Sequence, residues 1–193
     1  MAARRHVVSG DFELTMDELR VVARFVVEDA EGVLPVFERT VPGDPRPRAA
    51  IEAARVFVDG ADRTRLQRVA SIDAHRAARS APDEAARLAA RCAGDAAAAA
   101  YLHPLAQASQ VGHILRAAAS AARIGELAAG GDPAVGDALL DRARRRAGPV
   151  LLDVLRHYPP VTGGGSRVAR LMSTLDDALR RTPPGDEDEE DDA

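Results

Sequence analysis

The stretch that decides the fold reads DEAARLAARCAGDAAAAAYLHPLAQASQVGHILRAAASAARIGELAA, from Asp83 to Ala129. Almost every residue in it is a strong helix former, because Ala has the lowest intrinsic free-energy cost in a helix and Leu, Arg and Gln follow closely. Pro104 divides the stretch, since proline cannot donate a backbone hydrogen bond and disfavours helical geometry at the residue before it. The pattern predicts two helices, about Pro82–Leu102 and Pro104–Ala129, as the central pair of the domain.

Charged residues recur every four positions along the first of these helices. This spacing predicts a charged stripe with two ion pairs, Asp83–Arg87 and Arg91–Asp95, each one helical turn apart. Polar residues of the second helix come mostly every three positions, so their line winds around the helix axis. We therefore expect this helix to be contacted on different sides, with its Ala and Gly residues allowing close approach.

Apolar residues at intervals of three and four predict helices through most of the remaining chain. Thr15 and Glu18 form a capping box before the first of them. The helix that begins at Asp62 or Thr64 is expected to bury one face, formed by Leu66, Val69, Ala70, Ala74, Ala77 and Ala78. A later helix should break at Gly148-Pro149. We find no strand pattern, and 193 residues suit one domain. The prediction is an all-α bundle or array of about seven helices.

The two ends of the chain differ from its middle in composition. The net charge is −4, but seven acidic residues lie between Asp186 and Asp192, so without them the charge is about +3. The tail has too few apolar residues to bury, which predicts disorder. We expect a flexible leader over residues 1–11, a helical domain over 12–182 and a disordered acidic tail over 183–193.

Composition also excludes several classes of protein. Aromatic residues make up 3% of the chain, which argues against a surface that stacks single-stranded nucleic acid, and the near-neutral folded part lacks a basic footprint. The single Cys92 excludes an internal disulfide and fits a reducing cytoplasm. There is no signal-peptide pattern, and no apolar run approaches the ~20 residues of a membrane span. All 26 cationic residues are Arg, which with the abundant Ala indicates GC-rich bacterial coding. We expect a cytoplasmic bacterial protein that binds neither membrane nor nucleic acid.

Sequence motifs of common enzyme classes are missing. The chain has no G-x-S-x-G elbow, no H-E-x-x-H and no Glu-x-x-His pair. The sequence GGGSR at Gly163–Arg167 lacks the Lys and the spacing of a P-loop. These observations predict no enzyme activity, no cofactor and no bound metal.

Three histidines are the only candidates for an acid–base or metal cluster: His75, His103 and His113. They come from three predicted helices that could converge, but none is paired at a spacing of four, and the only nearby carboxylates are Asp73 and Asp95. The alternative is that they form hydrogen bonds in the core or at helix ends.

The segment VPGDPRPR, from Val41 to Arg48, is the most unusual local sequence. Asp44 can cap the helix that follows, and Arg46 and Arg48 can be solvated. Alternatively, the prolines fix a loop that presents an arginine fork to a carboxylate or phosphate. Asp44, Arg46 and Arg48 therefore join the three histidines as candidate binding residues. The run Arg142–Arg146 is expected to be a solvated face.

Two segments resemble the bacterial family of putative immunity proteins, an all-α class found near polymorphic-toxin genes. The first is PGDPRPRAAIEAARVF, Pro42–Phe57, and the second is AGDAAAAAYLHPLAQASQVGHILRAAASAAR, Ala93–Arg123. The resemblance covers roughly Phe12 to Arg181. It implies a cytoplasmic protein that binds and neutralises a cognate toxin and is not an enzyme. It names neither the toxin nor the oligomeric state.

Three functional hypotheses follow. The first is an immunity protein or other protein-binding module that acts through an exposed patch around Asp44–Arg48 or the acidic tail. The second is a helical enzyme, small-molecule binder or metal binder that uses His75, His103 and His113. The third, a DNA-associated regulator, is disfavoured by the near-neutral folded part.

Overall fold

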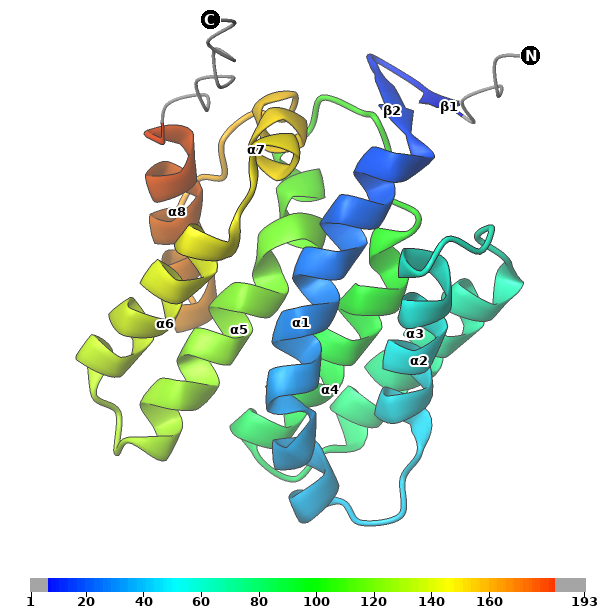
Figure 1. The fold of residues 1–193 in the computed structure, drawn as a ribbon. Coiled ribbons are helices and arrows are strands. Elements are labelled where there is room, and N and C mark those ends of the chain that lie inside the picture. The colour runs from blue at the N-terminus through cyan, green and yellow to red at the C-terminus, as the bar shows by residue number, and fades with distance from the viewer. Residues whose placement is uncertain (1–6, 183–193) are drawn as a thin grey trace, which may run out of the picture.

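The computed structural model describes residues 7–182, and this part of the chain is mostly helical (Figure 1). The elements are β1 Val7–Ser9, β2 Glu13–Thr15, α1 Met16–Thr40, α2 Arg46–Val58, α3 Arg65–Ser80, α4 Glu84–Ala99, the 3₁₀ helix η1 Ala108–Val111, α5 Gly112–Ala128, α6 Pro133–Arg146, α7 Pro149–Arg156 and α8 Arg167–Arg180. The predicted all-α fold is confirmed. The described residues hold eight α-helices instead of seven, because the expected break at Gly148-Pro149 separates α6 from α7.

Helix α4 lies at the centre of the first half of the chain and packs against α1, α2, α3 and α5 (Figure 1). A helix that is contacted on so many sides has almost no solvated face. Its buried residues are all small except one leucine and one aspartate: Ala86, Leu88, Ala89, Ala90, Cys92, Ala93, Gly94, Asp95, Ala96, Ala97 and Ala99. Small side chains let the axes of the neighbouring helices come close to α4, which is a narrow helix at the centre of this half of the fold.

Helix α5 joins this half to the rest of the fold. It packs on α1 and α4 on one side and on α6 and α8 on the other, and α7 packs on α1 and α8 (Figure 1). Ten of its residues are buried around its circumference, namely Gly112, Ile114, Leu115, Ala117, Ala118, Ala119, Ser120, Ala122, Ile124 and Glu126. The prediction that α5 is contacted on different sides is confirmed.

The N-terminal residues form a small antiparallel hairpin in which Val8 pairs with Leu14, a residue with no exposed surface. The expectation of no strand was wrong for this segment. Residues 7–11 of the expected leader lie in the hairpin, and residues 1–6 lie outside the described part of the chain. The strands are only three residues long, too short for their side-chain alternation to be a signal in the sequence.

The hairpin also explains why the second central helix begins later than predicted. It was expected from Pro104, but α5 begins at Gly112 after η1. The Asp11 backbone N–H donates to the Pro104 carbonyl oxygen at 2.8 Å, and the Ala106 N–H donates to Asp11 Oδ2 at 2.8 Å. These bonds hold residues after Pro104 in an extended loop, so contacts with a distant segment override their helix propensity.

The starts of α1, α3 and α8 were well predicted because they depend on a few adjacent residues. Thr15 and Glu18 form the expected capping box, and Thr64, one of the two expected starts, forms another with Gln67. Ser166 caps α8 by accepting from the Ala169 N–H. The acidic tail lies outside the described residues. In the part that is described, no helix is long and apolar enough to cross a membrane.

Gly32 lies in the interior of α1, yet nothing is within 4 Å of the position that a Cβ would take. Gly in a helix interior is less favourable than Ala because it loses more conformational freedom on folding. We predict that Gly32→Ala raises the free energy of unfolding by about 0.5–1 kcal/mol in urea titrations. Gly94→Ala is the contrasting variant and should lower it, because a Cβ there would lie 2.7 Å from the His75 ring. Equal effects of both substitutions would contradict the packing described for these two sites.

Candidate functional site

The Asp44–Arg48 segment spans the start of α2, so Arg46 and Arg48 lie in the helix and not on a loop, and both are bound to carboxylates of the same chain. Pro45 is the N-cap of α2, and Asp44 Oδ1 accepts from the Arg46 N–H at 3.1 Å. The Arg46 Nε–H and Nη2–H donate to the two oxygens of Asp44 at 2.9 and 2.6 Å. This pairing is the first cause that lowers the pKa of Asp44. The Arg48 guanidinium donates to both oxygens of Glu38, on α1, at 2.7 and 2.9 Å. Each of these two guanidinium groups, which could have bound an external carboxylate or phosphate, is thus already bound to a carboxylate of its own chain.

The three candidate histidines have different surroundings. His75 on α3 and His113 on α5 are partly buried, whereas His103 lies in the loop after α4 and is exposed. The His103 carbonyl oxygen accepts from the Tyr158 hydroxyl at 3.0 Å, so its backbone has a structural role. No group of three or more metal-binding side chains that could hold an ion occurs within residues 7–182.

Asp95 is the residue that brings His75 close to α5. Its carboxylate is 1% exposed and accepts from the Arg116 Nε–H and Nη2–H at 2.8 and 2.6 Å. The His75 Nε2 lies 3.7 Å from Asp95 Oδ1. The predicted surface pair Arg91–Asp95 was wrong, because α5 covers the side of α4 that carries Asp95. Sequence spacing identified a charged stripe but not which of its members faces another helix.

Burial favours the neutral form of His75 and His113. Burial is the first cause that lowers the pKa of His75, with Asp95 opposing it and Arg116 adding to it. Burial also lowers the pKa of His113, and the neighbouring Arg116 charge lowers it further. The His113 Nδ1 is buried and has no hydrogen-bond partner in the described part of the chain. The group therefore has one carboxylate paired with one guanidinium, and beside this ion pair lie two rings whose neutral form burial favours.

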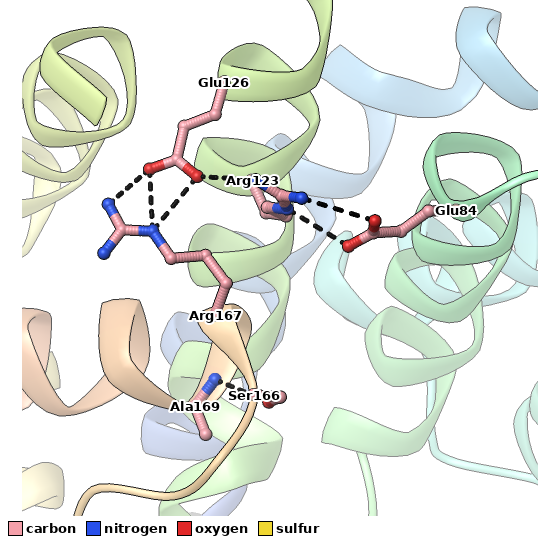
Figure 2. Close-up of polar contacts among 6 residues, drawn as sticks. All are labelled: Glu84, Arg123, Glu126, Ser166, Arg167 and Ala169. Atoms are coloured by element: carbon pink, nitrogen blue, oxygen red, sulfur yellow. Dashed lines mark hydrogen bonds and ion pairs between the residues drawn. The ribbon is translucent and has the colours of Figure 1, made fainter. Parts of the chain in front are cut away.

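A second buried carboxylate, not singled out from the sequence, lies at the other end of α5 (Figure 2). Glu126 is 1% exposed and accepts from the Arg167 Nε–H at 3.0 Å and from the Arg123 Nη1–H at 3.2 Å. Arg123 also donates to Glu84 of α4 at 3.1 Å. These bonds join α4, α5 and the first residue of α8.

Local sequence sets the position of this second cluster. Ser166 caps α8 and thereby fixes the start of the helix from which Arg167 points to Glu126 (Figure 2). Gly136 on α6 packs directly against the Glu126 side chain, and a Cβ there would collide with its Oε1. Hydrogen bonds from Arg167 are the first cause that lowers the pKa of Glu126. All these groups satisfy one another, so the cluster joins helices and has no open position for a ligand.

The solvent-facing side of α3 differs from the Asp95 and Glu126 clusters, in which the charged groups bind one another. Leu66, Val69 and Ile72 are 54%, 42% and 46% exposed, although Leu66 and Val69 were expected on the inner face. The inner face is instead made of small or short residues, since α4 packs closely against it: Gln67, Ala70, Ser71, Ala74, Ala77 and Ala78. The expected burial of the alanines is confirmed, and the expected burial of the larger residues was wrong.

Arginines surround these exposed aliphatic residues. Arg65, Arg68, Arg76 and Arg79 are all exposed on α3, and within residues 7–182 only Arg76 has an ion-pair partner, Asp73 at 2.9 Å. The Arg68 guanidinium stacks on the Tyr101 ring with 4.7 Å between its carbon and the ring centroid. We call this set the α3 outer surface; it comprises Leu66, Val69, Ile72, Arg65, Arg68, Arg76 and Arg79. It combines an apolar centre with a cationic margin.

Removing the charge of Asp95 tests whether the inner cluster supports the fold. Asp95→Asn leaves the mostly buried Arg116 without its counter-charge, so we predict a loss of about 3 kcal/mol in the free energy of unfolding. Asp73→Asn removes a carboxylate from an exposed pair and should change stability by less than about 0.5 kcal/mol. Urea titrations of both variants give the comparison, and similar losses would contradict a structural role that is specific to Asp95.

Stability should depend on the neutral state of His75 and His113. Their pKa values are lowered in the folded protein from an ordinary value of 6.5, so the unfolded chain binds these protons more readily. The free energy of unfolding is therefore highest above pH 6.5 and falls as the pH decreases through that value. Urea titrations between pH 8 and pH 5 measure the slope. The double variant His75→Gln/His113→Gln should flatten it, and an unchanged slope would assign the effect to other groups.

The search for related proteins adds one finding to this geometry. A family model described as Imm-5 like putative immunity protein matches residues 13–138, which is more than half of the chain. The match includes Asp95, Arg116 and the whole α3 outer surface. Searches of curated proteins and of solved structures found no significant match. The resemblance seen in the sequence is thus confirmed, and an immunity-like role is supported. The chain belongs to the Imm-5 like putative immunity protein family.

Proposed function

We propose that this protein neutralises a protein toxin by binding it through the α3 outer surface. The observation that carries the proposal is the row of Leu66, Val69 and Ile72, which are about half exposed on a helix that buries only small residues. Close packing against α4 leaves room for only small residues on the inner face, so the larger aliphatic residues lie outward. A protein partner that covers them removes their apolar surface from water.

The make-up of the α3 outer surface fits a protein partner. Protein interfaces have a core of apolar residues inside a polar margin, and Arg is enriched in them. Covering three half-exposed aliphatic side chains contributes roughly 1 kcal/mol each. Arginine guanidiniums can bind carboxylates with two parallel hydrogen bonds, which adds geometric specificity. The chemistry that matches is a toxin face with an apolar centre and acidic residues around it.

The charge of the α3 outer surface also favours fast association. Its four arginines face only one neighbouring carboxylate on the helix, Asp73, so the surface has a positive potential. A positive patch steers an acidic partner into the correct orientation and raises the association rate at low salt. Inhibition then follows from occlusion, since the bound helix covers part of the toxin surface.

The saturated interior is consistent with action through the surface. Asp95 and Glu126 accept hydrogen bonds from Arg116 and Arg167, and each is 1% exposed. The Asp44–Arg48 segment, which was one candidate patch from the sequence, is less suited to the role because its arginines are bound to Asp44 and Glu38. We therefore place the contact on α3 and not on that segment.

The experiment compares carboxylates introduced on the α3 outer surface with one introduced at Val150, which is about as exposed as Val69. Val69→Asp/Ile72→Asp places carboxylates in the middle of the α3 outer surface, whereas Val150→Asp changes a residue that is 43% exposed on α7. Binding to the purified product of the adjacent gene is measured by calorimetry. We expect a one-to-one complex that the α3 variant weakens by at least about 100-fold.

Two results would contradict the proposal. One is the absence of any stoichiometric complex between the wild-type protein and the adjacent gene product. The other is a complex in which the α3 variant and Val150→Asp bind as tightly as the wild-type protein. Circular dichroism of both variants serves as the folding control, and their thermal midpoints should match that of the wild-type protein because all three positions are exposed.

A further inference from the structure

A cavity lies on another side of the fold, between α1 and α6. Both helices pack on α5, which forms the floor, and they pack far less against each other (Figure 1). The cavity has a volume of about 490 Å³, within the range of small-molecule sites. Its lining is mostly apolar and includes Val33, Val36 and Leu139.

The cavity is open because its lining residues near the floor are small. Ala118, Ala121 and Gly125 present little side-chain volume from α5, and on α1 the Gly32 position has no atom within 4 Å of where a Cβ would be. Glycine in the middle of a helix has a conformational cost that this packing does not require. The cavity therefore results from the small residues at these positions of α1 and α5.

One end of the cavity is polar. Arg146 reaches from α6 to α1 and donates to Glu28 Oε2 and to Asp29 Oδ1, each at 2.6 Å. Its guanidinium carbon lies 4.6 Å from the centroid of the Phe25 ring, so stacking also holds it. Contrary to the expected solvated run, this arginine is turned inward and is fixed by four contacts, counting its 3.3 Å hydrogen bond to the Phe25 carbonyl oxygen.

Asp29 has binding capacity that the fold does not use. Its Oδ1 accepts from Arg146, but its Oδ2 is buried and has no hydrogen-bond partner in the described part of the chain. Burial is the first cause that raises the pKa of Asp29, and the charges of Arg146 and Arg142 oppose the rise. An unsatisfied buried acceptor is costly, and a ligand that brings a donor to it recovers that cost.

We propose that this cavity binds a small organic amine, with an apolar body against Val33, Val36 and Leu139 and an ammonium group that donates to Asp29 Oδ2. The unfilled position is an acceptor, which selects a donor over an anion. The charged residues that line the cavity are balanced, Glu28 and Asp29 against Arg142 and Arg146, so the selectivity rests on the unpartnered oxygen and not on net charge. The site is separate from the α3 outer surface, so its occupancy does not depend on the proposed toxin contact.

The test uses full-length protein and three primary amines, benzylamine, 2-phenylethylamine and cyclohexylmethylamine, each titrated up to 10 mM. Backbone ¹H–¹⁵N NMR spectra report which residues respond. We expect at least one amine to shift resonances of Gly32, Ala121 and Arg142 with saturation. The anion 3-phenylpropanoate, of similar apolar size, should bind at least 10-fold more weakly.

Two variants test separately whether amine binding needs the volume of the cavity and the charge of Asp29. Gly32→Leu places a side chain in the cavity and leaves the Asp29 carboxylate unchanged, so it should remove binding while the thermal midpoint is kept. Asp29→Asn should weaken amine binding at least 10-fold, and Asp153→Asn, at an exposed carboxylate on α7, should leave it unchanged. If Asp29→Asn unfolds the protein, amine binding to the Gly32→Leu variant still tests the proposal. The proposal is overturned if no amine binds at 10 mM, if the anion binds equally well, or if Gly32→Leu binds like the wild-type protein.

Discussion

The close packing of four helices around α4 is the constraint on which the rest of the structure depends. Alanine and glycine occupy nearly all of its buried positions, so helix axes can approach closely but side chains supply little interlocking shape. Any larger or polar side chain on α4 then needs its own space or its own bonding partner on a neighbouring helix. Asp95 is the clearest case, because it is fully enclosed and needs Arg116 from α5 to balance its charge.

The same constraint arranges the residues of α3 by size. Its inner face meets α4 and accepts only residues such as Ala70, Ala74 and Ala77, while Leu66, Val69 and Ile72 are left on the opposite side. A sequence pattern records which residues are apolar but not how much room the neighbouring helix leaves. The usual assumption that the larger apolar residues are the buried ones therefore fails on α3, and that failure reveals the exposed surface.

Features that depend on a few adjacent residues were predictable from the sequence, and features that depend on distant contacts were not. The capping box at Thr15, the cap at Ser166 and the break at Gly148-Pro149 are all set locally. The late start of α5 depends on Asp11, about a hundred residues before it, and the burial of Asp95 depends on Arg116. The six candidate residues from the sequence include two histidines of the inner cluster but neither of its charged members, because the spacing that drew attention to Asp95 suggested a surface pair.

Buried ion pairs have a particular use in a domain built from alanine. Two smooth helices can slide past one another between registers of similar packing energy, since small side chains form shallow ridges. Asp95 with Arg116 fixes α5 against α4 near one end, and Glu126 with Arg123 and Arg167 fixes α5, α4 and α8 near the other. A shift of one residue in either direction would separate both sets and leave charges buried without partners, which is far more costly than the shift in alanine packing. These clusters therefore oppose any change in the register of α5 against α4 and α8.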